Sequence, residues 1–265
     1  MDSAPHAILL AVAYDGSDFH GYAIQSNART VAGELLGAIR AMDPHVRDLR
    51  GVSRTDAGVH ARGQLVAFDT AATIPPRGWL LGLHAHLPPE IAPRRAAIVS
   101  VGFDARRHVL HKHYRYTILE DPLRDPFVDR FAWRIGAPLD LDRALCGARD
   151  AVGTHDFAAF RSSADERTST VRTMLEMSIT RGPIGSRLIF IDVVGTAFLH
   201  NMVRIVVGTL IDIARGRLDP GVIRKAIVSG DRSDLGITAP PQGLCLMSVT
   251  LGDTAQLRED WPPNV

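Results

Sequence analysis

The order of hydrophobic and polar residues along the 265-residue chain follows two periods. Seven runs have the length and the β-branched or aromatic content of strands. They are Ile8–Tyr14, Gln64–Asp69, Ala97–Val101, Tyr114–Leu119, Leu175–Thr180, Leu188–Val194 and Leu244–Leu251. Four other stretches repeat apolar residues every three to four positions, as amphipathic helices do. They are Val31–Met42, Leu141–Val152, Leu199–Arg215 and Val222–Ser229.

This mixture of elements predicts the fold class. Strands and helices alternate without the strict regularity of βαβ units, and many strands have one apolar face. We therefore predict an α+β protein of two halves, each a mixed or antiparallel sheet backed by helices. The halves are expected to be residues 1–106 and 107–265. The last helix is expected to begin at an N-cap, Asp219, followed by Pro220 at its first position.

Composition indicates a globular protein of the cytoplasm. The two cysteines, Cys146 and Cys245, form neither a disulfide framework nor a zinc motif, so a reducing compartment is expected. The N-terminal apolar run is short and lacks a basic region before it, which favours a strand over a signal peptide. No stretch reaches the roughly 18 apolar residues of a membrane span, so we expect no membrane.

The charge distribution is more informative than its sum. The formal net charge of +1 excludes an indiscriminate polyanion binder. However, the segment 106–115 holds four fixed cations, Arg106, Arg107, Lys112 and Arg115, with three histidines and no acid. Such a segment is typical of a nucleic-acid contact or of a solvated face. Its histidine spacing, without a carboxylate or thiol, does not fit a metal site, and none is expected.

One glycine-punctuated loop, SRTDAGVHARGQ (residues 53–64), places Arg54, Asp56 and His60 between two apolar runs. It is either a surface turn or a catalytic loop whose carboxylate is held by cations. In the apolar helix that follows residue 199, Arg204 is a cation within a buried stretch, and it therefore needs a partner or a path to water. Asp56 is one candidate partner and a structural acid is another.

The loop and a series of further motifs closely resemble the TruA-type tRNA pseudouridine synthases. The resemblance covers nearly the whole chain, in the order of the family. Its motifs are the loop from Gly51 to His60 with Gly63-Gln64, Tyr14-Asp15-Gly16, Phe19-His20-Gly21, His86–Ile91, Phe103–Arg106, His113–Tyr116, His155–Arg161, Phe198–Arg204 and Gly243–Leu246. One departure is Tyr22-Ala23, where the family usually has Trp-Gln.

The resemblance implies an isomerase that converts uridine to pseudouridine at tRNA positions 38, 39 and 40, in the anticodon stem-loop. It also implies a homodimer, no cofactor, and two pseudosymmetric halves with the active site in the cleft between them. In this reaction the N1–C1′ bond breaks, the uracil turns over, and C5 bonds to C1′.

The family's functional residues match four positions of this chain. Asp56 matches the essential aspartate, for which attack at C1′ and proton abstraction from the sugar both stay open. Arg204 matches the arginine that pairs with this carboxylate. Tyr114 matches the tyrosine that stacks on the uracil, with strand packing as its alternative role. Leu244 matches an apolar residue that lines the uracil site, and core packing is its alternative.

Arg54 precedes the aspartate by two residues. A base inside a stem must leave the stack before it reacts, and Arg54 could fill the vacated space or bind a phosphate. A structural hydrogen bond within the loop is the alternative. His60 and Gln64 are expected to support the loop.

Two other functions are alternatives. A glycosidase or nucleoside hydrolase built on Asp56 generally needs a second carboxylate, and the next acid along the chain, Asp69, lies at the far end of the following strand. A non-catalytic RNA-binding module would not need the set of Asp56, Tyr114 and Arg204.

Overall fold

The computed structural model describes residues 5–163, 165 and 167–252, which form two compact units. The first unit comprises the residues up to Leu110 and those from Leu246 onward, and the second comprises His111–Cys245. Strand β5 (Val109–Glu120) and strand β10 (Leu244–Leu251) each begin in one unit and continue into the other. The halves 1–106 and 107–265 stay a prediction.

The first unit is built on antiparallel strands. They are β1 (His6–Tyr14), β2 (Arg50–Gly51), β3 (His60–Thr70) and β4 (Ile91–Val99). β1 lies between β3 and β4, and Leu10 is paired with Val66 on one side and with Ala96 on the other. The short strand β2 pairs with β3. Residues 7–12 of β1 are fully buried, so this strand is the centre of the core of the unit.

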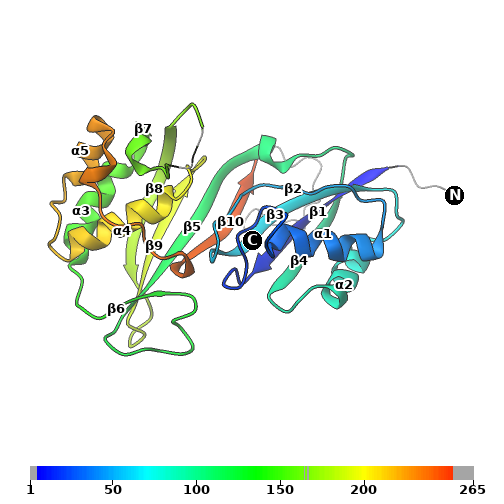
Figure 1. The fold of residues 1–265 in the computed structure, drawn as a ribbon, viewed down its shortest axis with the longest axis horizontal. Coiled ribbons are helices and arrows are strands. Elements are labelled where there is room, and N and C mark those ends of the chain that lie inside the picture. Colours follow the sequence, from blue (N-terminus) through cyan, green and yellow to red (C-terminus); the bar gives the residue numbers. More distant parts are fainter. Residues whose placement is uncertain (1–4, 164, 166, 253–265) are drawn as a thin grey trace. The chain divides into compact units, whose positions relative to one another are not determined.

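Two helices accompany this sheet (Figure 1). Helix α1 (Val31–Met42) begins where the hydroxyl of Thr30 accepts a hydrogen bond from the backbone N–H of Gly33. Its predicted limits are confirmed. Helix α2 (Pro76–His86) was not predicted, because only Trp79 and Leu83 of its residues are buried, which leaves a weak apolar period. A short 3-10 helix (Ala105–His108) precedes β5.

The second unit contains the part of the ten-stranded sheet that runs in the order β5-β9-β8-β7, with antiparallel neighbours. Its other strands are β6 (Trp133–Ile135), β7 (Gly153–Asp156), β8 (Val171–Arg181) and β9 (Leu188–Gly195). β6 pairs in parallel with the end of β5. Two short 3-10 segments, Ala158–Phe160 and Arg232–Asp234, lie in the connections, and a third, Pro241–Gly243, leads into β10.

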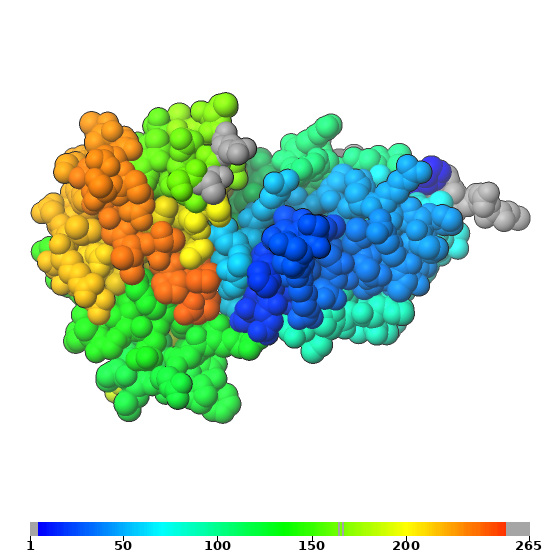
Figure 2. Space-filling view, in the orientation of Figure 1, coloured from blue at the N-terminus to red at the C-terminus, as the bar shows by residue number. Residues whose placement is uncertain are grey.

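Three helices gather in the second unit: α3 (Leu141–Ala151), α4 (Met202–Ala214) and α5 (Val222–Ser229). Every residue of α4 except Arg204 is buried, as its apolar sequence predicts. Helix α5 and the segment after it, orange in Figure 2, lie on the outside of this unit, where Val228 is 83% exposed.

The predicted bounds of α5 are confirmed, but its predicted N-cap, Asp219, is wrong by two residues. The N-cap is Gly221, and the carboxylate of Asp219 accepts a hydrogen bond from the N–H of Gly221, in the turn before the helix. Pro220 therefore belongs to this turn. The predicted α+β class is confirmed. Among the described residues, no helix combines the length and the hydropathy needed to cross a membrane.

Candidate active site

The loop that carries Asp56 connects β2 to β3 in the first unit, and a buried glutamine fixes its first residue. The side chain of Gln64 is fully buried. Its Oε1 accepts a hydrogen bond of 3.1 Å from the N–H of Ser53, and its Nε2 donates one of 2.5 Å to the carbonyl of Ser53. Both backbone groups of Ser53 are thereby satisfied without a regular strand, which supports the predicted role of Gln64 in holding the loop.

Thr55, the residue before Asp56, is held from two sides. Its hydroxyl lies 2.8 Å from the hydroxyl of Tyr14, at the end of β1. Its carbonyl accepts a hydrogen bond from the N–H of Tyr22. Between these segments Gly21 has a φ of +90°, and a Cβ on it would meet the carbonyl oxygen of Thr55 at 2.8 Å. A residue with a side chain at position 21 would therefore displace the backbone beside Asp56.

Asp56 itself begins a tight turn. Its carbonyl accepts a hydrogen bond of 3.1 Å from the N–H of Val59, and Gly58 has a φ of +76°. The Asp56 side chain is half-buried, and that of Arg54 is exposed. The loop thus presents a carboxylate on a backbone held at several points, with a cation at its surface.

His60 supports the loop, as predicted. It is 4% exposed, and its Nδ1 accepts a hydrogen bond of 3.0 Å from the N–H of Gly16. The same nitrogen lies 3.1 Å from a carboxylate oxygen of Asp15, so the ring is held against the turn that follows β1.

The departure at Tyr22 has a visible consequence. The ring is buried against Gly51, where a Cβ would overlap it, and stacks at 6.4 Å on the ring of Tyr14. Burial raises the pKa of the Tyr22 hydroxyl far above its ordinary value. Among the described residues, this hydroxyl has no hydrogen-bond partner. The ring of Tyr22 therefore packs closely against Gly51 and Tyr14, but its hydroxyl is buried without a hydrogen bond among the described residues.

In the second unit, Tyr114 lies on β5 and is 8% exposed. Its ring meets the ring of Phe198 edge to face, with centroids 5.3 Å apart. Phe198 lies just before α4 and begins the motif Phe198–Arg204, but the sequence indicated no role for it. An aromatic partner at right angles limits the ring positions that Tyr114 can adopt.

Arg204 is joined to the segment that leads into β10. Its Nε donates to the carbonyl of Ala239 at 2.8 Å, and its Nη1 donates to Oδ1 of Asn201 at 2.8 Å. The N–H of Ala239 donates in return to the carbonyl of Arg204. Arg204 is half-buried. The cation that the sequence places within a buried stretch therefore lies at the edge of the core.

Leu244 follows closely on this segment and is 5% exposed. The hydroxyl of Tyr116 donates to the carbonyl of Pro240 at 2.7 Å, and the Tyr116 ring lies so close to Gly243 that a Cβ there would overlap it. Because Tyr116 and Tyr114 share one face of β5, the second unit brings three predicted residues, Tyr114, Arg204 and Leu244, to one region. The pairing of Asp56 with Arg204 stays a prediction.

The basic segment 106–115 divides between different environments. Arg106 forms hydrogen bonds with the carboxylate of Asp104. Arg115 and His113 both bind the carboxylate of Asp192, at 2.9 and 2.6 Å. Partial burial alone would raise the pKa of Asp192, but these hydrogen bonds outweigh burial and lower it. These three basic residues therefore have structural partners.

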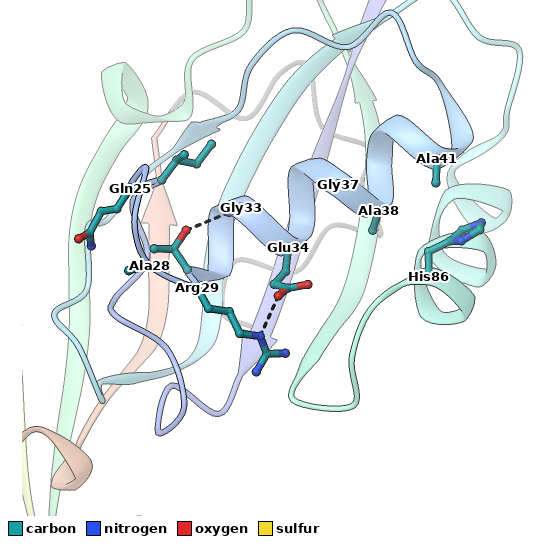
Figure 3. A pocket seen from close by; sticks show the side chains of 11 residues that line it. Gln25, Ala28, Arg29, Gly33, Glu34, Gly37, Ala38, Ala41 and His86 are labelled. Atoms are coloured by element: carbon teal, nitrogen blue, oxygen red, sulfur yellow. Dashed lines mark hydrogen bonds and ion pairs between the residues drawn. The ribbon is translucent and has the colours of Figure 1, made fainter.

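A pocket of about 500 Å³ lies along α1 (Figure 3). It is lined by Ile24, Gln25, Ala28, Arg29, Thr30, Gly33, Glu34, Gly37, Ala38, Ala41 and His86. The carboxylate of Glu34 is bound by Arg29 at 2.7 Å, and the Arg29 guanidinium also lies over the ring of Phe19. Asp56 does not line this pocket.

Comparison with known proteins decides the family. The sequence pattern of a family described as tRNA pseudouridine synthase matches residues 148–250. A tRNA pseudouridine synthase A of Geotalea daltonii is 41% identical over 242 residues, which cover 91% of this chain and 98% of that protein. The chain belongs to the tRNA pseudouridine synthase A family. The predicted family and enzyme class are thereby confirmed.

Further relatives agree. The tRNA pseudouridine synthase A of Citrifermentans bemidjiense is 43% identical, over 91% of this chain and 96% of that protein. That of Brevibacillus brevis is 40% identical, over 90% of this chain and 96% of that protein. Among solved structures, a chain from the crystal structure of a Cbf5-Nop10-Gar1 complex is 12% identical, with a TM-score of 0.37 over 90% of this chain and 48% of that chain. This structural similarity is too low to add to the argument.

Proposed function

We propose that this member of the tRNA pseudouridine synthase A family isomerises uridine to pseudouridine at positions 38, 39 and 40 of tRNA, in the anticodon stem-loop. The observation that carries the proposal is the Asp56 loop. The half-buried carboxylate stands on a backbone fixed by Gln64, Tyr14 and Tyr22. Such fixation favours a reaction in which the carboxylate must meet one sugar atom in one orientation.

Asp56 is proposed to act on the ribose of the target uridine. Either it attacks C1′ as the N1–C1′ bond breaks, or it removes a proton from the sugar so that the base can leave. In the first route the bond between Asp56 and C1′ breaks again as C5 bonds to C1′, and in the second the sugar regains its proton when C5 bonds to C1′. In both routes the uracil turns over, and C5 loses a proton while N1 gains one. Both routes require an ionised carboxylate, for which we propose Arg204 as the partner.

The other predicted residues are proposed to bind the substrate. Tyr114 stacks on the uracil and Leu244 covers its apolar edge. Arg54, whose side chain is exposed, occupies the space that the target base vacates or binds a neighbouring phosphate. No redox group or group donor takes part in this rearrangement. We further propose that the enzyme is a homodimer and works in the cytoplasm, where it meets its tRNA substrate.

The contacts of Asp69 argue against a hydrolase. Both carboxylate oxygens are bound by Arg50, at 2.7 and 2.9 Å, and one also accepts the N–H of Gly102. Partial burial alone would raise the pKa of Asp69, but these bonds lower it. Such a carboxylate is held as a structural anion and is a poor general acid.

The test uses unmodified tRNA transcripts that carry uridine at only one of positions 38, 39 and 40, with cytidine at the other two. We expect pseudouridine at each position and no free uracil. Release of uracil would indicate a hydrolase, and binding without either product would indicate an RNA-binding module. Pseudouridine formation only at positions outside the anticodon arm would overturn the proposed specificity.

A further inference from the structure

One face of the second unit brings together cations from three separate segments. Lys112 lies on β5, Arg172 on β8, and Arg167 in the connection before β8. We call these three residues the cation cluster. None of them was a predicted catalytic residue, and two of them, Arg167 and Arg172, lie outside the basic segment 106–115.

The strand register places the cluster on the same face as Tyr114. Lys112 is paired with Gly195 of β9, and Gly195 is paired with Met174 of β8. Paired residues share a face, as do residues two apart on one strand. Lys112 therefore shares a face with Tyr114, and Arg172 shares it through Met174. Gly195 between them has no side chain, and Phe198 lies over it.

Arg167 connects the cluster to the Tyr114 site. Its Nη1 donates to the carbonyl of Phe198 at 2.7 Å, and Phe198 is the residue whose ring meets Tyr114. The cluster thus lies beside the ring that we propose to stack on the target uracil.

Among the described residues, the cluster meets more cations than acids. A carboxylate beside it is that of Asp165, which lies 3.4 Å from Nε of Arg167. Asp165 also accepts the N–H groups of His200 and Arg167, at 2.8 and 3.1 Å. This carboxylate is therefore shared between a cation of the cluster and two backbone N–H groups.

Burial adds to this imbalance. Burial and the charge of Arg167 lower the pKa of Lys112 to about 8, and the same two causes lower the pKa of Arg172. The Nε of Arg172 is buried without a hydrogen-bond partner among the described residues. Holding like charges close together and away from water destabilises the unliganded protein, and a bound anion offsets this effect.

We propose that the cation cluster binds a phosphodiester group of the RNA backbone next to the target uridine. Arginine forks match phosphate oxygens, and backbone phosphates supply much of the affinity of proteins for nucleic acids. The cluster would thereby set the register of the strand on the enzyme, so that the uracil reaches Tyr114. This inference rests on the proposed function, because it takes tRNA as the ligand.

The test compares the full-length wild type with Arg172→Gln, using synthetic anticodon stem-loops. The matched control is Arg181→Gln, which removes a surface charge at the other end of β8, where Arg181 binds Glu120 at 2.8 Å. We expect Arg172→Gln to weaken RNA binding about tenfold and to flatten the dependence of log K on log salt by about 0.7 to 0.9 per lost phosphate contact. The control variant should keep both the RNA affinity and the rate at saturating RNA within about twofold of wild type.

Stem-loops with one uncharged methylphosphonate linkage identify the phosphate. We expect one linkage beside the target uridine to weaken binding by the wild type but to have no additional effect on Arg172→Gln. If each methylphosphonate linkage weakens RNA binding by the variant as much as RNA binding by the wild type, the cluster does not bind phosphate and the proposal is wrong. If Arg172→Gln does not fold, Arg167→Gln replaces it, since that side chain is 49% exposed.

The outcome separates this inference from the proposed function. A wild type that binds the stem-loop but forms no pseudouridine would refute the function, whereas the linkage comparison would still locate the phosphate. A wild type that forms pseudouridine while Arg172→Gln and Arg167→Gln bind normally at every salt concentration would refute the cluster alone.

Discussion

The hydroxyl groups of Tyr14 and Thr55 lie 2.8 Å apart, in the interior of the first unit, although 41 residues separate them in the chain. Tyr14 ends the central strand β1, and Thr55 is bonded to Asp56. This contact fixes the proposed catalytic residue to the most buried strand of the unit. The position of the carboxylate is therefore set by the core.

Replacing Tyr14 with phenylalanine tests this link. The change removes one hydroxyl at almost constant shape and leaves the Thr55 hydroxyl without this partner. We expect a loss of about 1–2 kcal/mol in the free energy of unfolding and a fall in the single-turnover rate, because Asp56 gains freedom to move. Urea unfolding and rapid-quench measurements give the two values. A less stable variant with an unchanged rate would show that the contact serves stability alone.

Asp56→Asn should separate binding from chemistry. The substitution removes the charge and preserves the shape, so the loop contacts of Ser53 and Thr55 remain. We expect pseudouridine formation to fall at least a thousandfold, while the affinity for tRNA changes little, because binding rests on phosphate contacts. Product mapping and a filter-binding titration measure the two quantities. Turnover within tenfold of wild type would exclude Asp56 as the essential residue.

Tyr22→Phe should stabilise the protein. The Tyr22 hydroxyl is buried and unsatisfied among the described residues, and its removal ends the cost of withdrawing it from water. We expect the free energy of unfolding to rise by about 1 kcal/mol, with the ring contacts to Gly51 and Tyr14 kept. Thermal unfolding of the two proteins measures the change. A lower Tm for the variant would mean that the hydroxyl has a partner in solution, such as an ordered water.

The carboxylate of Asp192 should make stability sensitive to acid. Its pKa is lowered in the folded protein, because the hydrogen bonds from His113 and Arg115 outweigh its burial. A lowered folded pKa stabilises the fold above the unfolded pKa of about 3.9, and this contribution is lost as the pH falls through the folded value. We expect Asp192→Asn to lower the free energy of unfolding by about 1–2 kcal/mol at pH 5.

The difference between wild type and Asp192→Asn should shrink as the pH falls below about 4. Urea unfolding between pH 3 and 5 measures it. A difference that stays constant over this range would mean that the effect is one of packing. RNA affinity serves as the control and should not change, because Asp192 engages the opposite face of β5 from Tyr114.

Local patterns in the sequence predict much of the fold. Helix α4 was found because nearly all its residues are apolar, and α1 because its apolar period is regular. Helix α2 was missed because its buried face consists of Trp79 and Leu83 alone. The loop motif indicated which residue carries the chemistry. It could not indicate that Gln64 would bind both backbone groups of Ser53, since such contacts depend on how distant segments meet.

The strand period of the segment 106–115 is more informative than its total charge. Residues on a strand alternate between faces. That period alone separates Lys112, on the face of Tyr114, from His113 and Arg115, on the face of Asp192. The contribution of Arg167 and Arg172 required the pairing of β8 with β9, which the sequence pattern does not provide.

The route of the chain also bears on how the protein is made. The first unit, which carries Asp56, includes the residues from Leu246 onward, so part of its sheet is synthesised after the entire second unit. On the ribosome, the nascent first unit must therefore wait for β10 while the second unit emerges and can fold. Contacts between such distant segments form slowly. Catalytic competence should consequently appear only after the last strand has left the exit tunnel.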